Sequence, residues 1–282
     1  MQELWRKTIT LFWSEPILWL PVLCADIAAF CLTRLQKFFT RQIVLWFLQN
    51  HHSVLSNSPA SSNNIAVFIM KAALLAGPFV WGTYFLCICL YTAAFVVTAS
   101  LVHQFLQRQQ SDLSFALTSL RSCFRSISFF SLKLLGLYAI AAVFLVSATS
   151  LIQSVHPAKF LTEQPVIFSS FFLISVWIAY NMTPAGIRLL RNPQSPSITA
   201  QSIKSGRTFA ILIVLASTTI GYFAQVSEMS FSSTSLFSRG IGLLTMEGVA
   251  SLIVAFPYVL LFIALALTAT RNVEDVEPNS AS

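Results

Sequence analysis

Asp26 is the residue whose type and setting point most directly to chemistry. It lies ten residues after Pro16 and eight before Arg34, inside an apolar segment that we predict to cross a membrane. A charge at the centre of such a helix costs about 2.5 to 3.5 kcal/mol or more, so an ionisable residue there is a functional candidate by default. Asp26 could relay a proton or a cation, or contact a substrate. The structural alternative, an acid held by Lys133, a hydroxyl group or an amide, is favoured because no second acid lies deep beside it.

Other residues capable of catalysis or metal binding form no recognisable pattern. His51 and His52 are adjacent, so their side chains diverge, and no carboxylate or cysteine pattern accompanies them. Cys87 and Cys89 are two residues apart, about 200° around a helix, and so do not face one site. The sequence contains no HExxH, P-loop, CxxC or GxSxG motif. We predict no catalytic residue, no metal site and no cofactor, and therefore a protein that is not an enzyme.

Four cations are candidates for contacts with lipid head groups at the membrane surface. They occur in two short polar segments, 119–125 and 202–207, each of which begins with a serine, an aliphatic residue, a cation and a second serine. Cations beside apolar segments are typical of membrane interfaces. The candidates are Arg121, Arg125, Lys204 and Arg207.

The composition indicates what kind of scaffold positions these residues. The chain has 282 residues, of which 56% are apolar and only 10% are charged. Soluble domains contain about 25% charged residues, so the deficit indicates a polytopic membrane protein. The net charge of +7 comes from cations scattered at the ends of apolar runs, which favours a role in membrane topology over binding of nucleic acid. The predicted partners are membrane lipids, with a protein partner or a second copy as further options.

The longest run without charged residues, 72–107, is the strongest indication that the chain crosses a membrane. It contains 36 residues without Asp, Glu, Lys or Arg, whereas about 20 apolar residues carry a helix across a bilayer. We predict an all-α bundle of about six transmembrane helices in a single membrane domain, residues 1–270, followed by a disordered polar tail, 271–282. The predicted spans are 16–33, 78–103, 127–150, 165–187, 209–226 and 248–269.

Short segments beside these spans have helical periodicity or limited length. Residues 1–14 place Leu4, Thr8 and Phe12 on one face, which predicts an amphipathic helix in the cytoplasmic interface held by Trp5 and Trp13. The alternative is that these residues form the first turns of the first span. A similar period over 111–126 predicts a surface helix, capped by Ser111 or Asp112, that leads into the third span.

Two further segments and one proline bear on where the predicted spans begin and end. Residues 34–49 either continue the first helix beyond the membrane or lie along its far surface. Residues 65–76 are too short to span, at about 18 Å, and Gly77-Pro78 predicts a break before the second span. We therefore expect a short interfacial helix there, with a re-entrant element as the alternative. Pro184 is expected to kink or end the fourth helix.

The distribution of cations predicts the topology. With six spans, and with Lys71 and Lys133 set aside, ten cations fall on the side of the two termini and five on the other side, which favours cytoplasmic termini. Three polar or amphipathic segments, 1–14, 111–126 and 196–208, each precede a predicted helical hairpin. This arrangement suggests a threefold hairpin pseudo-repeat.

The Leu4-Trp5-Arg6-Lys7 start and the segments 119–125 and 202–207 carry a resemblance to a known group. On these residues the chain resembles uncharacterised six-span bacterial membrane proteins, which are similar to the membrane domain attached to some glycerophosphodiester phosphodiesterases. The resemblance implies a multi-pass protein of the bacterial inner membrane. The chain lacks room for a catalytic phosphodiesterase domain, so the resemblance implies no such activity.

Three functional interpretations follow from the sequence. The first is a non-enzymatic scaffold, partner subunit or lipid-organising protein, favoured because charges within the spans are scarce. The second is a small transporter or permease that uses Asp26, since prolines in the fourth and sixth spans could expose backbone groups along a path. An intramembrane enzyme ranks last.

Overall fold

The computed structural model of the protein describes residues 2–50, 62–107, 112–155, 160–189, 200–230, 253 and 255–269. These residues are helical apart from short links, which confirms the predicted all-α class. The predicted tail, 271–282, lies outside the described residues. The first residues of the predicted sixth span, 248–252, also lie outside them. The helices are α1 (Gln2–Ser14), the short 3-10 helix η1 (Pro16–Leu18), α2 (Leu20–Asn50), α4 (Ser62–Leu106), α5 (Leu113–Val155), α6 (Phe160–Leu189), α7 (Ala200–Ser230) and a C-terminal helix (Ala255–Ala269).

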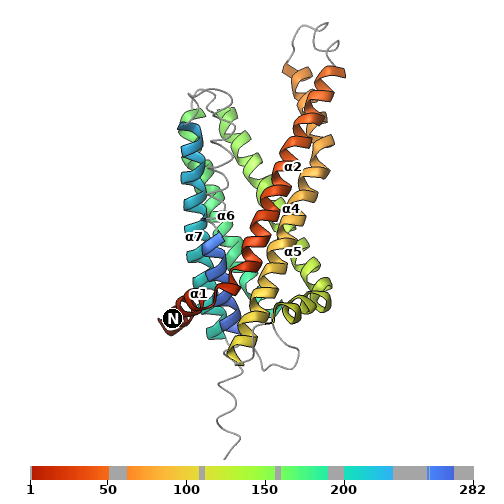
Figure 1. The fold of residues 1–282 in the computed structure, drawn as a ribbon. Helices are drawn as coiled ribbons and strands as arrows, with labels where there is room; N and C mark the ends of the chain where they lie inside the picture. Colours follow the sequence, from red (N-terminus) through yellow and green to blue (C-terminus); the bar gives the residue numbers. More distant parts are fainter. Residues whose placement is uncertain are drawn as a thin grey trace, which may run out of the picture.

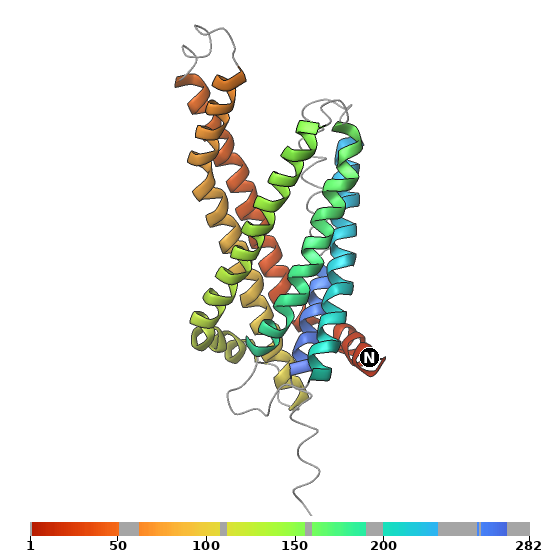
Figure 2. The same ribbon diagram turned by 180° about the vertical axis from the view of Figure 1, so that it is seen from behind.

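The long helices form two arms that meet at one end, here called the base (Figures 1 and 2). The α2/α4 hairpin is one arm and the α6/α7 pair is the other, with α5 packed against α4 and α6 between them. The C-terminal helix, drawn in blue, lies at the base beside α7, and α1 crosses the base next to it (Figure 1). Helices from both ends of the sequence therefore close the bundle where the arms converge.

Within the described residues, three helical segments are long and apolar enough to cross a membrane: Pro16–Trp46, Leu75–Leu106 and Leu113–Phe144. They contain the first two predicted spans and most of the third, so the structure supports a membrane protein. On α5, large apolar side chains at Phe129, Leu132, Ile140 and Phe144 follow helical spacing and are exposed. A continuous exposed apolar face of this kind suits contact with lipid. The six-span count and the pseudo-repeat remain predictions.

The predicted break at Gly77-Pro78 is wrong, because α4 runs without interruption from Ser62 to Leu106. Residues 65–76 are therefore neither a separate interfacial helix nor a re-entrant element. Pro78 removes a single backbone donor, and a helix in lipid has no water with which to replace the remaining bonds, so continuing the helix costs less than ending it. A Cβ added to Gly77 would meet no atom within 4 Å, so this glycine marks no close packing.

Other predicted boundaries also disappear into longer helices. The chain over 34–49 continues α2, as one of the two alternatives expected. The segment 111–126 is not a separate helix, since α5 is continuous from Leu113. The first turns of α5 lie across the base, and the rest of the helix runs away from the base (Figure 1). Asp112 caps this start, with its Oδ1 accepting from the Ser114 backbone N–H at 2.8 Å. Similarly, α7 begins at Ala200 and absorbs the described part of 196–208, and α6 continues through Pro184 to Leu189.

The first helix, α1, has the face that the sequence predicts, and it packs against protein. Leu4, Thr8, Leu11 and Phe12 are buried, while Trp13 is 70% exposed. The Trp5 ring lies 4.5 Å from the Phe209 ring of α7, measured between centroids. Because η1 separates α1 from α2, the alternative that residues 1–14 begin the first span is wrong.

An aromatic cluster at the base joins α1, η1 and the C-terminal helix. The Trp19 ring lies 4.8 Å from Phe12 and 5.6 Å from Phe256, and its Nε1–H donates to the Phe12 carbonyl at 2.7 Å. Carbonyls in the last turn of a helix lack intrahelical donors, so the indole satisfies one of them at the end of α1. This cluster fixes the N-terminal helix to the last described helix of the chain.

Candidate functional site

Asp26 lies in the second turn of α2 with only 4% of its surface exposed. The Tyr91 hydroxyl of α4 donates a hydrogen bond to its Oδ1 at 2.6 Å. Of the partners considered from sequence, a hydroxyl is therefore the one observed, whereas the Lys133 side chain is exposed on α5. The sequence did not single out Tyr91, because its partner lies 65 residues away along the chain.

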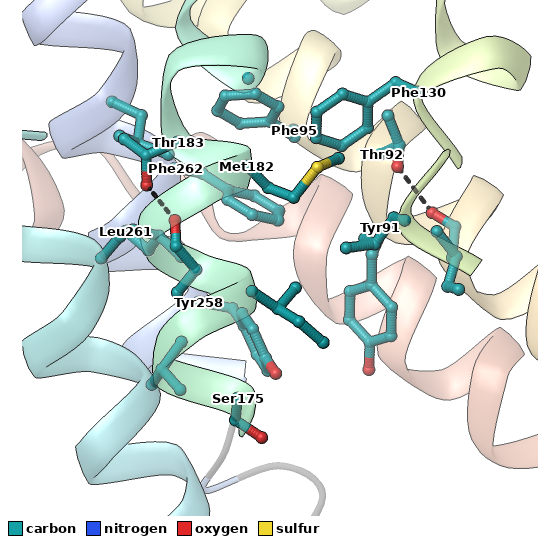
Figure 3. A pocket seen from close by; sticks show the side chains of 18 of the residues that line it. Tyr91, Thr92, Phe95, Phe130, Ser175, Met182, Thr183, Tyr258, Leu261 and Phe262 are labelled. Carbon is teal, nitrogen blue, oxygen red and sulfur yellow. Dashed lines mark hydrogen bonds between the residues drawn. The ribbon is translucent and has the colours of Figure 1, made fainter. Parts of the chain in front are cut away.

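The Tyr91 side chain also lines a pocket of about 250 Å³. The pocket lies between the arms, and Figure 3 shows the side chains around it. None of the residues that line it is charged. The lining residues are Ile88, Tyr91, Thr92 and Phe95 of α4; Phe130, Leu134 and Tyr138 of α5; Ser175, Ile178, Ala179, Met182, Thr183 and Gly186 of α6; Ala210 and Val214 of α7; and Tyr258, Leu261, Phe262 and Leu265 of the C-terminal helix.

Four aromatic rings form a continuous wall between α4 and the C-terminal helix. Ring centroids are 5.5 Å apart for Tyr91 and Tyr258, 6.3 Å for Tyr258 and Phe262, and 5.0 Å for Phe262 and Phe95. Each pair is tilted, within the range in which aromatic pairs attract one another. We call these four residues the aromatic wall. It fixes the position of the Tyr91 ring and so the direction from which its hydroxyl reaches Asp26.

Polar and apolar groups occupy different ends of the pocket. In Figure 3 the hydroxyls of Tyr91, Tyr258 and Ser175 lie toward one end, and the Phe95 and Phe130 rings lie toward the other. Further hydroxyls are used within the bundle: Ser131 bonds Thr92 at 3.2 Å between α5 and α4, and Thr183 donates to the Ala179 carbonyl at 2.7 Å. The site can therefore hold a mainly apolar ligand that carries a polar group at one end.

The chemistry available in the pocket is binding by apolar contacts and hydroxyl groups. The Tyr91 hydroxyl, which bonds Asp26, can both donate and accept a hydrogen bond. No group of three or more His, Cys, Asp or Glu side chains in the described part of the chain could hold a metal ion. The adjacent histidines, His51 and His52, lie outside the described residues.

The four cations expected at head groups do not share one environment. Arg121, Arg125 and Lys204 are exposed, whereas Arg207 is half-buried against α6. The start of α5 and the start of α7, which carry them, lie at the same end of the molecule (Figures 1 and 2). The structure thus places them at one end without bringing them into a single cluster, and their contact with lipid remains a prediction.

Arg207 has a structural partner that the sequence analysis missed. Its Nε–H donates to the Tyr180 carbonyl at 3.2 Å and its NH1 group bonds the Tyr180 hydroxyl at 3.1 Å, while the guanidinium carbon lies 4.0 Å from the ring centroid. Tyr180 is four residues before Pro184, which has no N–H to donate to that carbonyl. The arginine therefore supplies the donor that proline removes. The sequence feature that could have indicated this contact is a proline within one helix and an arginine on the next.

Arg207→Ala should lower the free energy of unfolding by about 1 kcal/mol, because a carbonyl loses its donor. In a Pro184→Ala background the restored backbone N–H can serve that carbonyl, so the effect of Arg207→Ala should shrink. Thermal unfolding of the four proteins in detergent measures this difference. Lys204→Ala, at an exposed position on the same helix, is the matched control. An equal loss in both backgrounds would show that Arg207 does not substitute for the proline nitrogen.

Comparisons of the chain with models of protein families, with curated proteins and with solved structures found no match. The resemblance to six-span bacterial membrane proteins thus stays a prediction. Function is inferred below from the Asp26–Tyr91 bond and the pocket that Tyr91 lines.

Proposed function

We propose that the protein is a small permease of the bacterial inner membrane, without enzymatic activity, that binds its solute in the pocket between the two arms. The observation that carries this proposal is the hydrogen bond from Tyr91 to Asp26. Tyr91 both bonds this buried carboxylate and lines the pocket, so it links the two. Ionisable residues within transmembrane helices commonly mark solute or proton paths. Transporter sites also lie where two groups of helices meet. A change in the Asp26–Tyr91 bond would move the Tyr91 ring and with it the aromatic wall.

The distribution of hydroxyls supports a permease over the scaffold that the sequence favoured. The sequence favoured the scaffold because charges within the spans are scarce. In the fold, however, Tyr91, Tyr138, Ser175 and Tyr258 come from four different helices to line one pocket. A few polar groups that converge in a mainly apolar cavity are typical of a small-molecule site.

The proposal includes a multi-pass topology with both termini in the cytoplasm. The base carries α1 and the starts of α5 and α7, and these segments contain Arg6, Lys7, Arg121, Arg125, Lys204 and Arg207. Cations concentrate on the cytoplasmic side of membrane proteins. This orientation would place the base, and the aromatic cluster that includes Trp19, at the cytoplasmic surface.

A cysteine at Ser175 tests whether the pocket opens to both sides of the membrane. In a variant whose five native cysteines are replaced, Ser175→Cys should react with a membrane-impermeant maleimide in intact cells and also in inverted vesicles. Ser175 is buried in the structure, so labelling from each side requires the arms to open in turn. Ser122→Cys, at an exposed position near the start of α5, should react only in inverted vesicles and reports the orientation.

The second candidate is the scaffold, partner subunit or lipid-organising protein. The exposed apolar face of α5, which includes Phe129 and Ile140, favours it because such a face can bind lipid or another helix. If Ser175→Cys is unreactive from both sides while Ser122→Cys reacts normally, the permease proposal fails and this candidate replaces it. A reaction of Ser122→Cys in intact cells would reverse the proposed topology.

A further inference from the structure

We propose that the pocket between the arms binds an organic cation of the quaternary ammonium type. This inference rests on the proposed function, since it names the class of solute that the permease would carry. It depends on three features: the aromatic rings around the pocket, the bond from Tyr91 to Asp26, and the absence of charged side chains from the pocket lining.

Aromatic side chains surround the pocket on more than one side. The aromatic wall brings four rings from α4 and the C-terminal helix, and Phe130 and Tyr138 add two from α5. In Figure 3 the labelled Phe130 ring lies near Phe95, and Met182 of α6 lies between these rings and Tyr258. The face of an aromatic ring is negative and attracts a cation within about 6 Å of its centroid, most strongly where water is excluded. Several such faces around one volume form a cage suited to a cation.

The bond to Asp26 makes one of these rings a better partner for a cation. A phenol that donates to a carboxylate gains electron density, since its proton is drawn toward the carboxylate oxygen. The face of Tyr91 should therefore be more negative than that of an isolated tyrosine. The Asp26 carboxylate itself lies one hydrogen bond behind this ring, at 2.6 Å from the hydroxyl. No Lys, Arg or His is among the residues that line the pocket, so none of the lining side chains opposes a bound cation by its charge.

The lining selects a quaternary ammonium over a primary amine. A primary ammonium group has three N–H donors, and burying them without acceptors is costly. The oxygen acceptors among the lining side chains are uncharged hydroxyl groups, and one of them, Thr92 Oγ1, already accepts from the Ser131 hydroxyl at 3.2 Å. A quaternary ammonium has no N–H group and presents only polarised methyl groups, which suit ring faces and the Met182 thioether. At about 250 Å³ the pocket suits a small ligand, and the hydroxyls of Ser175 and Tyr258 are among the polar groups that line it.

Binding of benzyltrimethylammonium and of its neutral carbon isostere, neopentylbenzene, to the full chain in detergent tests the proposal. Isothermal titration should give an affinity for the cation at least about tenfold higher than for the isostere. Asp26→Asn should reduce the affinity for the cation about tenfold and leave that for the isostere unchanged. Glu3→Gln removes the same charge from an exposed position on α1 and should change neither affinity. If Asp26→Asn does not accumulate, Tyr91→Phe keeps the ring, removes the hydrogen bond and should weaken cation binding severalfold.

The isostere separates a cation site from a pocket for hydrocarbon. If neopentylbenzene binds as tightly as the cation, or if neither compound binds, the cation proposal is overturned. It is equally overturned if Asp26→Asn and Tyr91→Phe both bind the cation like the wild type. None of these results removes the permease proposal, which depends on labelling of Ser175→Cys from both sides. Conversely, cation binding that depends on Asp26, together with a pocket that never opens to one side, would support a cation-binding protein that is not a permease.

Discussion

Gly206→Leu should leave little folded protein, whereas the same change at Gly136 should be tolerated. A Cβ added to Gly206 would lie 3.0 Å from the Cδ1 of Ile187, 3.3 Å from the Cγ2 of Thr183 and 3.4 Å from the Cδ2 of Leu265. These three atoms belong to α6 and the C-terminal helix, so Gly206 is where α7 approaches both. Ile187 is itself fully buried and has little space into which to move. Small residues allow helices to pack closely in membranes even without a GxxxG pair.

Overpacking a buried contact typically costs about 1 to 3 kcal/mol, and leucine adds four carbon atoms at a point that is already tight for one. Gly136 lies on α5 and its added Cβ would meet no atom within 4 Å. Leucine there should be neutral or slightly favourable, because it is a better helix former than glycine. The monodisperse fraction in size-exclusion chromatography and the melting temperature in detergent measure both variants. Similar behaviour of the two would mean that α7 does not approach α6 as closely as the structure shows.

Tyr91→Phe should lower the free energy of unfolding by about 1 to 3 kcal/mol, because it takes a donor from a buried carboxylate. Asp26→Asn changes the charge but keeps an oxygen that can accept from the Tyr91 hydroxyl, so it should cost less. In the Asp26→Asn background the effect of Tyr91→Phe should shrink, since a neutral amide tolerates the loss of a donor better than an ion does. Thermal unfolding in detergent gives the three differences.

Tyr84→Phe is the matched control for this pair, since Tyr84 lies on the same helix and is 52% exposed. It should leave stability unchanged. If Tyr91→Phe is no more destabilising than Tyr84→Phe, the bond to Asp26 contributes nothing to folding. A large loss of folded protein in Asp26→Asn would show that the acid is mainly structural, as the sequence favoured, and would weaken its assignment to a solute path.

Features that depend on local composition could be predicted from the sequence. The all-helical membrane class follows from long runs without charge such as 72–107, and the buried face of α1 follows from the spacing of Leu4, Thr8 and Phe12. Asp26 could be selected because a charge stands out among apolar residues. Boundaries could not be predicted as well, because Gly77-Pro78 breaks helices in water, whereas α4 continues through it. Rules drawn from soluble helices overstate such breaks where the backbone has no alternative partner.

Contacts between distant segments carried no signal of comparable strength. Tyr91 and Tyr258 resemble many other aromatic residues in apolar runs, and only the fold brings them together at a centroid distance of 5.5 Å. The pocket depends on five helices, so no single stretch of sequence contains its pattern. Arg207 could be selected from the sequence as a cation beside an apolar segment. Its hydrogen bond to the Tyr180 carbonyl could not be predicted, because that bond depends on the position of α7 beside α6.

The aromatic cluster at the base has a consequence for the order in which the bundle assembles during synthesis. Phe12 and Trp19 are made well before Phe256, yet the Phe12 ring lies 6.2 Å and the Trp19 ring 5.6 Å from the Phe256 ring. The ribosome adds about 5 to 20 residues per second, so the first helix must wait tens of seconds or so for its partner. During this delay the apolar face of α1 has no C-terminal helix to cover it. We expect α1 to lie on the membrane surface during this delay, until the C-terminal helix packs against it in a late, non-local step.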